Sequence, residues 1–146
     1  MIDIDIMSIL SQLEDISNAA GKEFELTNQL VGMQQEWQEI LFDLLPYRDT
    51  DTFILASVDD IQTILDDQVL KSQAMRRSAF IVALGTKADD WEDKLVNMQD
   101  ILDFWVNVQA TWMYLEPIFS SEDIMRQMPI EGRNFKAVRI FCLYIH

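Results

Sequence analysis

Four pairs of adjacent carboxylates are the side chains best suited to chemistry in this sequence. They are Asp59 and Asp60, Asp66 and Asp67, Asp89 and Asp90, and Glu92 and Asp93. Two carboxyl groups held at different pKa values can act as a general acid and a general base. Neighbouring acids on an amphipathic helix, however, usually belong to its solvated face. We therefore predict that the four pairs are exposed and that none of them is catalytic.

The acidic segment 49–51, Asp-Thr-Asp, alternates carboxylates as the start of a calcium-binding loop does. Such a loop needs a glycine at its sixth position for a sharp turn, and this sequence has Ile54 there. Phe53 occupies a position where a ligand is required. The segment is therefore predicted to be a polar turn that binds no metal ion.

Nucleophilic, zinc and nucleotide chemistry also lack their usual residue patterns. His146 is the only histidine and Cys142 the only cysteine, so we expect neither a Cys-His pair nor a zinc site. A Walker-type phosphate loop requires glycine, four residues and then Gly-Lys-Ser/Thr. The segment Gly85 to Lys87 reverses this order, and Phe80 stands where the first glycine belongs. We expect no catalytic residue, no cofactor site and no metal ligand in this chain.

Composition limits the remaining classes of function. The 146 residues fit one domain, and 49% of them are hydrophobic, which is enough to fill a core and excludes a disordered acidic tail. The net charge of -14 argues against binding to nucleic acid or an anionic membrane and favours basic partners. The apolar segment from Phe104 to Leu115 is shorter than the roughly 20 residues that span a bilayer. A single cysteine suits a reducing compartment.

Hydrophobic spacing predicts helices over most of the chain. The first stripe recurs at steps of three and four residues and consists of Leu30, Met33, Trp37, Ile40 and Leu44. Pro46 requires this helix to end by Leu45. Upstream, Ile9, Leu13, Ile16 and Ala20 keep a similar rhythm, which fits either one long helix or two in series.

Four further helices and one hairpin follow from the same reasoning. Aromatic and β-branched residues on both sides of a polar turn predict a short β-hairpin near residues 47–55. A helix should run from Ser57 to about Met75, and a long one from Thr86 to Tyr114, ended by Pro117. Short helices are expected after Ser120 or Ser121 and over residues 131–138. The predicted fold is all-α, an elongated bundle of long antiparallel helices with at most that one hairpin.

The long helix has a seven-residue rhythm that is broken only at Gln109. Its apolar residues are Leu84, Ala88, Trp91, Leu95, Met98, Leu102, Trp105 and Trp112. The tryptophans fit a ligand cage or a helix core, and we favour the core. The basic cluster of residues 75–77 fits a docking site or a helix C-terminus stabilised by its dipole, and we favour the dipole.

Several stretches together carry a family resemblance. They are YRDTDTFIL (47–55), VDDIQTILDD (58–67), WVNVQATWMYLEPIFSSEDIMRQMP (105–129) and MPIEGRNF (128–135). They closely resemble the linker region of dynein heavy chains, particularly axonemal ones. The resemblance covers residues 16–138, with a weakly matched lead-in helix at 1–15 and a divergent tail at 139–146. We therefore expect a fragment or short isoform of a heavy chain.

The resemblance implies a non-catalytic mechanical arm of an ATP-driven, minus-end-directed microtubule motor in the cytoplasm and the ciliary axoneme. Its implied partners are the AAA+ ring and the remaining linker, with dynein intermediate and light intermediate chains reached through the parent complex. The alternatives are a free-standing helical adaptor and a regulatory fragment that competes with full-length heavy chains.

Apolar surface left without neighbours predicts self-association of the fragment. The tail contributes Ile140, Phe141, Leu143, Tyr144 and Ile145. We expect sedimentation to detect species larger than a monomer as the protein concentration rises. A clean monomer over a wide concentration range would contradict this expectation.

Overall fold

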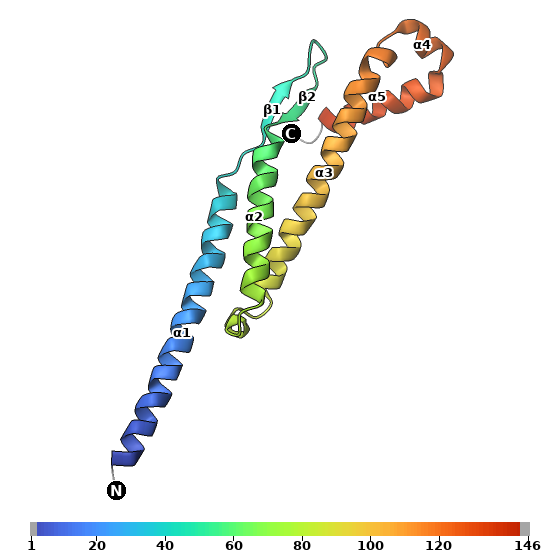
Figure 1. Ribbon diagram of the computed structural model, residues 1–146. Helices are drawn as coiled ribbons and strands as arrows, with labels where there is room; N and C mark the ends of the chain where they lie inside the picture. The colour runs from blue at the N-terminus through green and yellow to red at the C-terminus, as the bar shows by residue number, and fades with distance from the viewer. Residues whose placement is uncertain (1–2, 144–146) are drawn as a thin grey trace. The chain divides into compact units, whose positions relative to one another are not determined.

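Residues 3–143 are described by the computed structural model, and they form helices joined by one β-hairpin (Figure 1). Side chains are described for residues 7–82 and 84–138, so the apolar tail residues named above lie outside this set. The elements are α1 (Asp3–Gln38), β1 (Asp43–Pro46), β2 (Phe53–Ala56), α2 (Val58–Arg76), the 3₁₀-helix η1 (Ile81–Leu84), α3 (Lys87–Phe119), α4 (Glu122–Gln127) and α5 (Pro129–Leu143). The all-α fold class with one short hairpin is confirmed.

The chain divides into two compact units. The first consists of Met1–Ile40 and Thr63–Asn97, and the second of Leu41–Gln62 and Met98–His146. Each unit is therefore built from two separate stretches of sequence, and the divisions fall inside α2 and α3. Because continuous helices cross from one unit to the other, no Pro- or Gly-rich linker separates the units at these two points. The usual sequence signal of a domain boundary is therefore missing there.

The first unit packs α1, α2, η1 and the beginning of α3 around an apolar core. Its most buried residues are Leu30, Met33, Leu65, Met75, Leu84, Ala88 and Leu95. Gln68 lies in this core with no exposed surface, and its amide donates to the Glu36 carboxylate at 2.8 Å and to the Met33 carbonyl at 3.5 Å. These bonds satisfy the amide nitrogen, while the buried Oε1 of the same side chain has no hydrogen-bond partner among the described residues.

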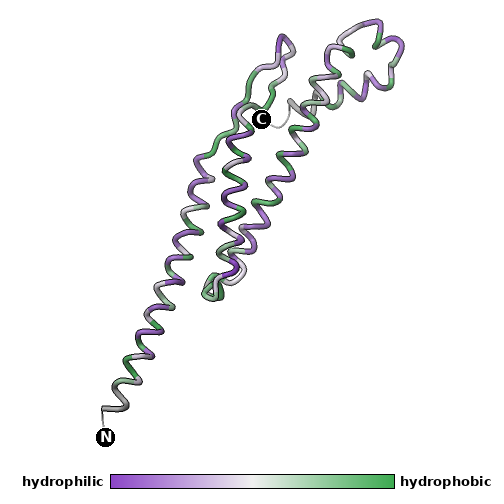
Figure 2. The backbone as a smooth tube through the Cα atoms, in the orientation of Figure 1, coloured by the Kyte–Doolittle hydropathy of each residue, from purple (hydrophilic) through white to green (hydrophobic). Residues whose placement is uncertain are grey.

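α1 is one continuous helix, which decides between the two alternatives left by the sequence. Gly21 lies inside it, and a single glycine costs a helix only about 1 kcal/mol. The apolar side chains of its first half are exposed, with Met7 at 70%, Leu13 at 56% and Ile16 at 64%. Figure 2 shows apolar and polar residues mixed along this helix. Within the described residues, no helix is both long and apolar enough to cross a membrane.

Two residues of the predicted first stripe lie outside α1, which ends at Gln38. Ile40 lies in the connection to the hairpin. Leu44 belongs to strand β1, where it pairs with Leu55 and is 39% exposed. Pro46 forces the residue before it into an extended conformation, and pairing with β2 continues that conformation back to Asp43. Strand pairing therefore overrides the helical spacing at this position.

The hairpin near residues 47–55 is confirmed, with antiparallel strands β1 and β2 on either side of its turn. The Tyr47 amide donates to the Thr52 carbonyl at 2.8 Å, which closes the turn. Arg48 and Asp51 adopt positive φ angles of 51° and 47°. The Thr52 hydroxyl, in a side chain only 2% exposed, donates to the Thr50 carbonyl at 2.9 Å. The acidic segment is thus a polar turn, as predicted.

The prediction that Pro117 ends the long helix was wrong. α3 continues through Pro117 to Phe119. A proline inside a helix removes one hydrogen bond and crowds the carbonyl four residues earlier, here that of Met113. Because Pro117 stands in the last turn, only that one bond is lost before the helix ends. The buried residues of the predicted stripe are Leu84, Ala88, Leu95, Leu102 and Trp112. Trp91, Met98 and Trp105 are half-buried.

The starts of α2 and α4 follow the prediction, whereas α5 begins two residues before the predicted residue 131. α2 covers the expected span from Ser57 to Met75 with only small shifts at its ends. α4 begins after Ser121 and ends before Pro129, as predicted. α5 then begins at Pro129, where proline suits the first turn of a helix. It continues to Leu143, beyond the predicted end at residue 138.

Replacing Trp112 with alanine should destabilise the protein, because the indole is 3% exposed and packed between aromatic rings. We expect the free energy of unfolding to fall by about 3 to 5 kcal/mol, measured by denaturant titration. Tyr114 is the matched control, because it stands on the same helix and is 73% exposed. Tyr114→Ala should change the value by less than about 0.5 kcal/mol. Equal effects of the two substitutions would contradict the assignment of Trp112 to the core.

Candidate functional site

The carboxylate pairs lie on exposed helix surface with one exception. Glu92 is only 8% exposed, which corrects its assignment to the solvated face. It accepts a bond from Arg76 at 2.8 Å, and the same guanidinium pairs with Asp89 at 2.7 Å. The hydrogen bond to Glu92 and the charges of both acids raise the pKa of Arg76. Arg76 in the last turn of α2 is thus engaged in ion pairs within the first unit, so a structural role accounts for it without a docking partner.

Metal binding finds no support in the part of the chain whose side chains are described. Within that part, no group of three or more His, Cys, Asp and Glu side chains is arranged to hold a metal ion. The acids of residues 49–51 lie in the hairpin turn, which is closed by the bond from the Tyr47 amide to the Thr52 carbonyl.

The most elaborate arrangement lies in the second unit, where the hairpin meets α3 and α5. We call it the junction and define it by Tyr47, Arg48, Gln109, Trp112 and Glu116. Tyr47 and Arg48 come from the hairpin turn, and the other three come from α3. Positions 109, 112 and 116 follow one another at steps of three and four, so they share one face of the helix.

Gln109 joins α3 to strand β2 through both ends of its side-chain amide. Its carbonyl oxygen accepts from the Leu55 amide at 2.7 Å, and its amide nitrogen donates to the Leu55 carbonyl at 3.0 Å. Leu55 exchanges no backbone bonds with β1 at this position, because both of these groups point toward Gln109. The side chain therefore takes the place of a neighbouring strand.

Tyr47 supplies the bond that Pro117 cannot make. Its hydroxyl donates to the Met113 carbonyl at 3.4 Å. In a regular helix that carbonyl would accept from the amide of residue 117, which proline lacks. The side chain of Tyr47 is 8% exposed, so the contact lies in a largely dry environment. The hairpin thus compensates for a defect in α3.

Four aromatic rings connect the hairpin, α3 and α5. The Tyr47 ring meets the Trp112 ring edge to face, with centroids 5.4 Å apart. Trp112 stacks on Phe135 at 6.0 Å, and Phe135 stacks on Phe119 at 5.1 Å. Pairs in these geometries contribute about 0.5 to 1.5 kcal/mol beyond the area that they bury. Phe135 is therefore the residue that brings α5 into the junction.

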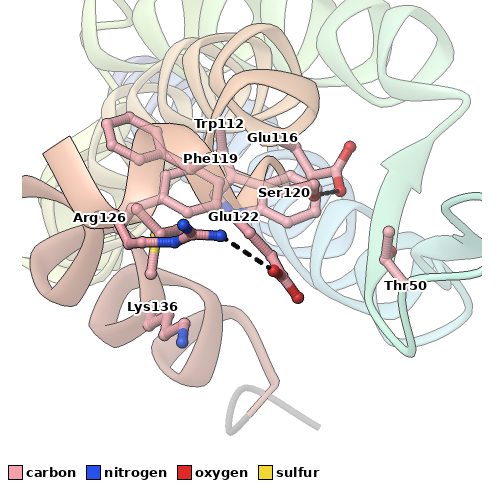
Figure 3. A pocket seen from close by; sticks show the side chains of 10 residues that line it. Thr50, Trp112, Glu116, Phe119, Ser120, Glu122, Arg126 and Lys136 are labelled. Atoms are coloured by element: carbon pink, nitrogen blue, oxygen red, sulfur yellow. Dashed lines mark hydrogen bonds and ion pairs between the residues drawn. The ribbon is translucent and has the colours of Figure 1, made fainter. Parts of the chain in front are cut away.

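A buried carboxylate completes the junction. Glu116 is 9% exposed, and its carboxylate accepts from Arg48 at 3.4 Å. It also accepts from the Ser120 hydroxyl at 2.6 Å (Figure 3). The Arg48 guanidinium carbon also lies 4.9 Å from the centre of the Tyr47 ring. Two donors therefore compensate for the cost of removing this carboxylate from water.

A cavity of about 510 Å³ opens beside Glu116. It is lined by Thr50, Trp112, Glu116, Phe119, Ser120, Glu122, Met125, Arg126, Phe135 and Lys136. Four of these residues are charged. Glu116 pairs with Arg48, Glu122 pairs with Arg126, and Lys136 is the fourth. The Ser120 hydroxyl is held against the Glu116 carboxylate, but the same carboxylate is also paired with Arg48. A carboxylate that accepts from both groups fits a structural role better than that of a general base.

Sequence reasoning identified some of these residues and missed others. Trp112 and Phe119 were singled out as parts of an informative stretch, and both contribute to the junction. Gln109 was noticed only as a break in the apolar rhythm, and that break was the available signal for a polar contact. The pairing of Arg48 with Glu116 had no local signal, because the two residues are 68 positions apart.

Comparisons with known proteins give a consistent result. The family described as "Dynein heavy chain, N-terminal region 2" matches residues 1–142. Dynein axonemal heavy chain 3 of Homo sapiens is 49% identical over 138 residues, covering 94% of this chain and 3% of that protein. Dynein axonemal heavy chain 12 of Rattus norvegicus is 48% identical over 138 residues, covering 94% and 4%. Dynein axonemal heavy chain 1 of Rattus norvegicus is 38% identical over 137 residues, covering 94% and 3%. The chain therefore spans 3% to 4% of the length of these relatives.

Replacing Gln109 with methionine keeps the length of the side chain and removes both bonds to Leu55. Because Leu55 is 8% exposed, its amide and carbonyl would be left without partners, and we expect a loss of about 2 to 4 kcal/mol in unfolding free energy. Gln109→Glu retains an oxygen that can accept from the Leu55 amide, so its unfolding free energy should fall by less than that of the methionine variant. Denaturant titration of the three proteins tests this order. A methionine variant as stable as the original would show that the amide does not hold the hairpin.

Proposed function

Because the chain belongs to the dynein heavy chain family, through its N-terminal region 2, we propose that it is a non-catalytic mechanical segment of the linker of an axonemal heavy chain. In this proposal the parent protein is an ATP-driven, minus-end-directed microtubule motor of cilia or flagella. The observation that carries it is the family match over residues 1–142, together with 49% identity to an axonemal relative. The small share of each relative that is covered favours one element of a larger machine.

The junction supports a mechanical role, because it attaches the hairpin to α3 at successive turns. The contacts made by Gln109, Met113 and Glu116 lie along one face of that helix. Packed interiors deform little and change between discrete arrangements, so a segment held in this way can transmit force. α1 and α3, with 36 and 33 residues, add helices of roughly 54 and 50 Å.

Exposed apolar residues on α1 support the proposed partners. Ile9, Leu13 and Ile16 are each at least half exposed, and their spacing places them on one face of the first half of that helix. Scattered apolar residues are normal on a surface, but a helix face of this kind suits contact with another element. We propose that the remaining linker and the AAA+ ring of the heavy chain cover it. Intermediate and light intermediate chains would be neighbours in the same axonemal complex.

A helix-breaking substitution in the full heavy chain tests the mechanical role. Lys94 is an exposed residue inside α3, and Lys94→Pro should disrupt the helix there at a cost of about 3 kcal/mol. We expect microtubules to glide more slowly over the variant while ATP hydrolysis per heavy chain is retained. Lys94→Ala is the matched control, because it removes the same charge and keeps the helix.

Two results would count against the proposal. Unchanged gliding by a Lys94→Pro heavy chain whose helix is broken would remove the mechanical role. ATP hydrolysis by the isolated chain, above that of a blank preparation, would contradict its non-catalytic character. The retained ATP hydrolysis of the Lys94→Pro heavy chain also serves as the evidence that the rest of the motor remains folded.

A further inference from the structure

Ser120 makes a contact that depends on the proton of its hydroxyl. The residue is exposed and lies in the turn between α3 and α4, and its hydroxyl donates to the Glu116 carboxylate at 2.6 Å. Because Glu116 is only 9% exposed, the lost hydration of its charge is replaced by two donors, Ser120 and Arg48. Figure 3 shows Ser120 and Glu116 facing each other beside the cavity. Any change that turns this donor into an anion would reverse the sign of the contact.

We propose that Ser120 is a phosphorylation site. Its phosphate would break the hydrogen bond to Glu116, repel that carboxylate and pair with Arg126 and Lys136 in the cavity instead. A protein kinase would supply the phosphoryl group from Mg-ATP. The bond between the γ-phosphorus and its bridging oxygen breaks, a bond from Ser120 Oγ to phosphorus forms, and the hydroxyl proton passes to a base of the kinase. ADP leaves. The proposal does not depend on the motor role.

The surroundings of Ser120 fit recognition by a kinase with a basic substrate groove. Glu122 and Asp123 follow at the second and third positions, and both are strongly exposed, at 92% and 79% of the side chain. Carboxylates at these positions would pair with Lys and Arg in such a groove. The net charge of -14 increases the attraction to a basic partner at longer range.

α4 can open at low cost to present this segment. It has six residues and none of them is buried. Ser121 stands at its N-terminus without a side-chain capping bond. Helices with few buried contacts are the first parts of a protein to unfold locally. A kinase, which binds its substrate in an extended form, would therefore find residues 120–123 accessible without disruption of the junction core.

The phosphate would act on two groups in opposite ways. At neutral pH it carries a charge of about -1.5 to -2 and cannot donate to Glu116, so the two anions repel each other. Arg126 and Lys136 line the same cavity and offer positive charge. Arg126 now pairs with Glu122 at 3.5 Å and Asp123 at 3.6 Å, and such exposed pairs contribute little, so the guanidinium can turn to a phosphate.

Phosphorylation in vitro tests the site. The purified chain is incubated with Mg-ATP and a serine kinase that requires an acid three residues after the serine, and the phosphate is located by tandem mass spectrometry. We expect the label on Ser120, with loss of labelling in Ser120→Ala and in Asp123→Asn. Label confined to Ser121, or no label under conditions that fully modify a control peptide, would overturn the proposal.

Thermal unfolding of the modified protein tests the coupling to Glu116. Phosphorylation should lower the melting temperature of the original chain. In Glu116→Gln the repulsion is absent, so the decrease should disappear or become an increase. In Arg126→Ala with Lys136→Ala the decrease should become larger, because the phosphate loses its cations. An identical decrease in all three proteins would overturn the proposed exchange of contacts. Ser120→Ala is the control, because it shows how much the melting temperature falls when only the hydrogen bond to Glu116 is lost.

Discussion

A backbone donor or acceptor that loses its regular partner must find another, and the junction satisfies this requirement at two places. The Leu55 amide and carbonyl face away from β1 and are bound by Gln109. The Met113 carbonyl is deprived of its helical partner by Pro117 and accepts from Tyr47. Unsatisfied groups in such positions cost about as much as a lost hydrogen bond or more. The bonds of Gln109 to Leu55 and of Tyr47 to Met113 together place the hairpin against α3.

The charged part of the junction depends on the same placement. With the hairpin turn held beside α3, Arg48 reaches Glu116 at 3.4 Å and lies over the Tyr47 ring. The carboxylate can be buried only because Arg48 and Ser120 both donate to it. Phe135 then extends the packing to α5 by stacking on Trp112 and Phe119. Three elements distant in the sequence thus meet around one tryptophan.

Local sequence patterns predicted the helices well because burial repeats with the helical period. Leu95, Leu102 and Trp112 are buried as their spacing indicated, and the family resemblance is confirmed over nearly the whole chain. The errors arose where an interaction from outside the segment decided the outcome. Leu44 follows its partner strand instead of a helical stripe, and α3 passes Pro117 because only one bond is lost there.

The candidate site was less predictable than the fold. Its contacts join residues such as Arg48 and Glu116, or Leu55 and Gln109, that are 68 and 54 positions apart. Periodicity describes one element at a time and gives no information about which side chains meet across elements. A polar residue in an apolar stripe was the only local sign, and it indicated Gln109 without indicating its partner.

The two edges of the hairpin have a consequence for assembly. Gln109 occupies the outer groups of Leu55 on β2, so another chain cannot add a strand at that point. On β1, Pro46 is opposite Phe53 and has no amide hydrogen to offer to an incoming strand. Both edges are therefore poor templates for intermolecular sheet growth, and cross-β polymerisation from the native hairpin is disfavoured.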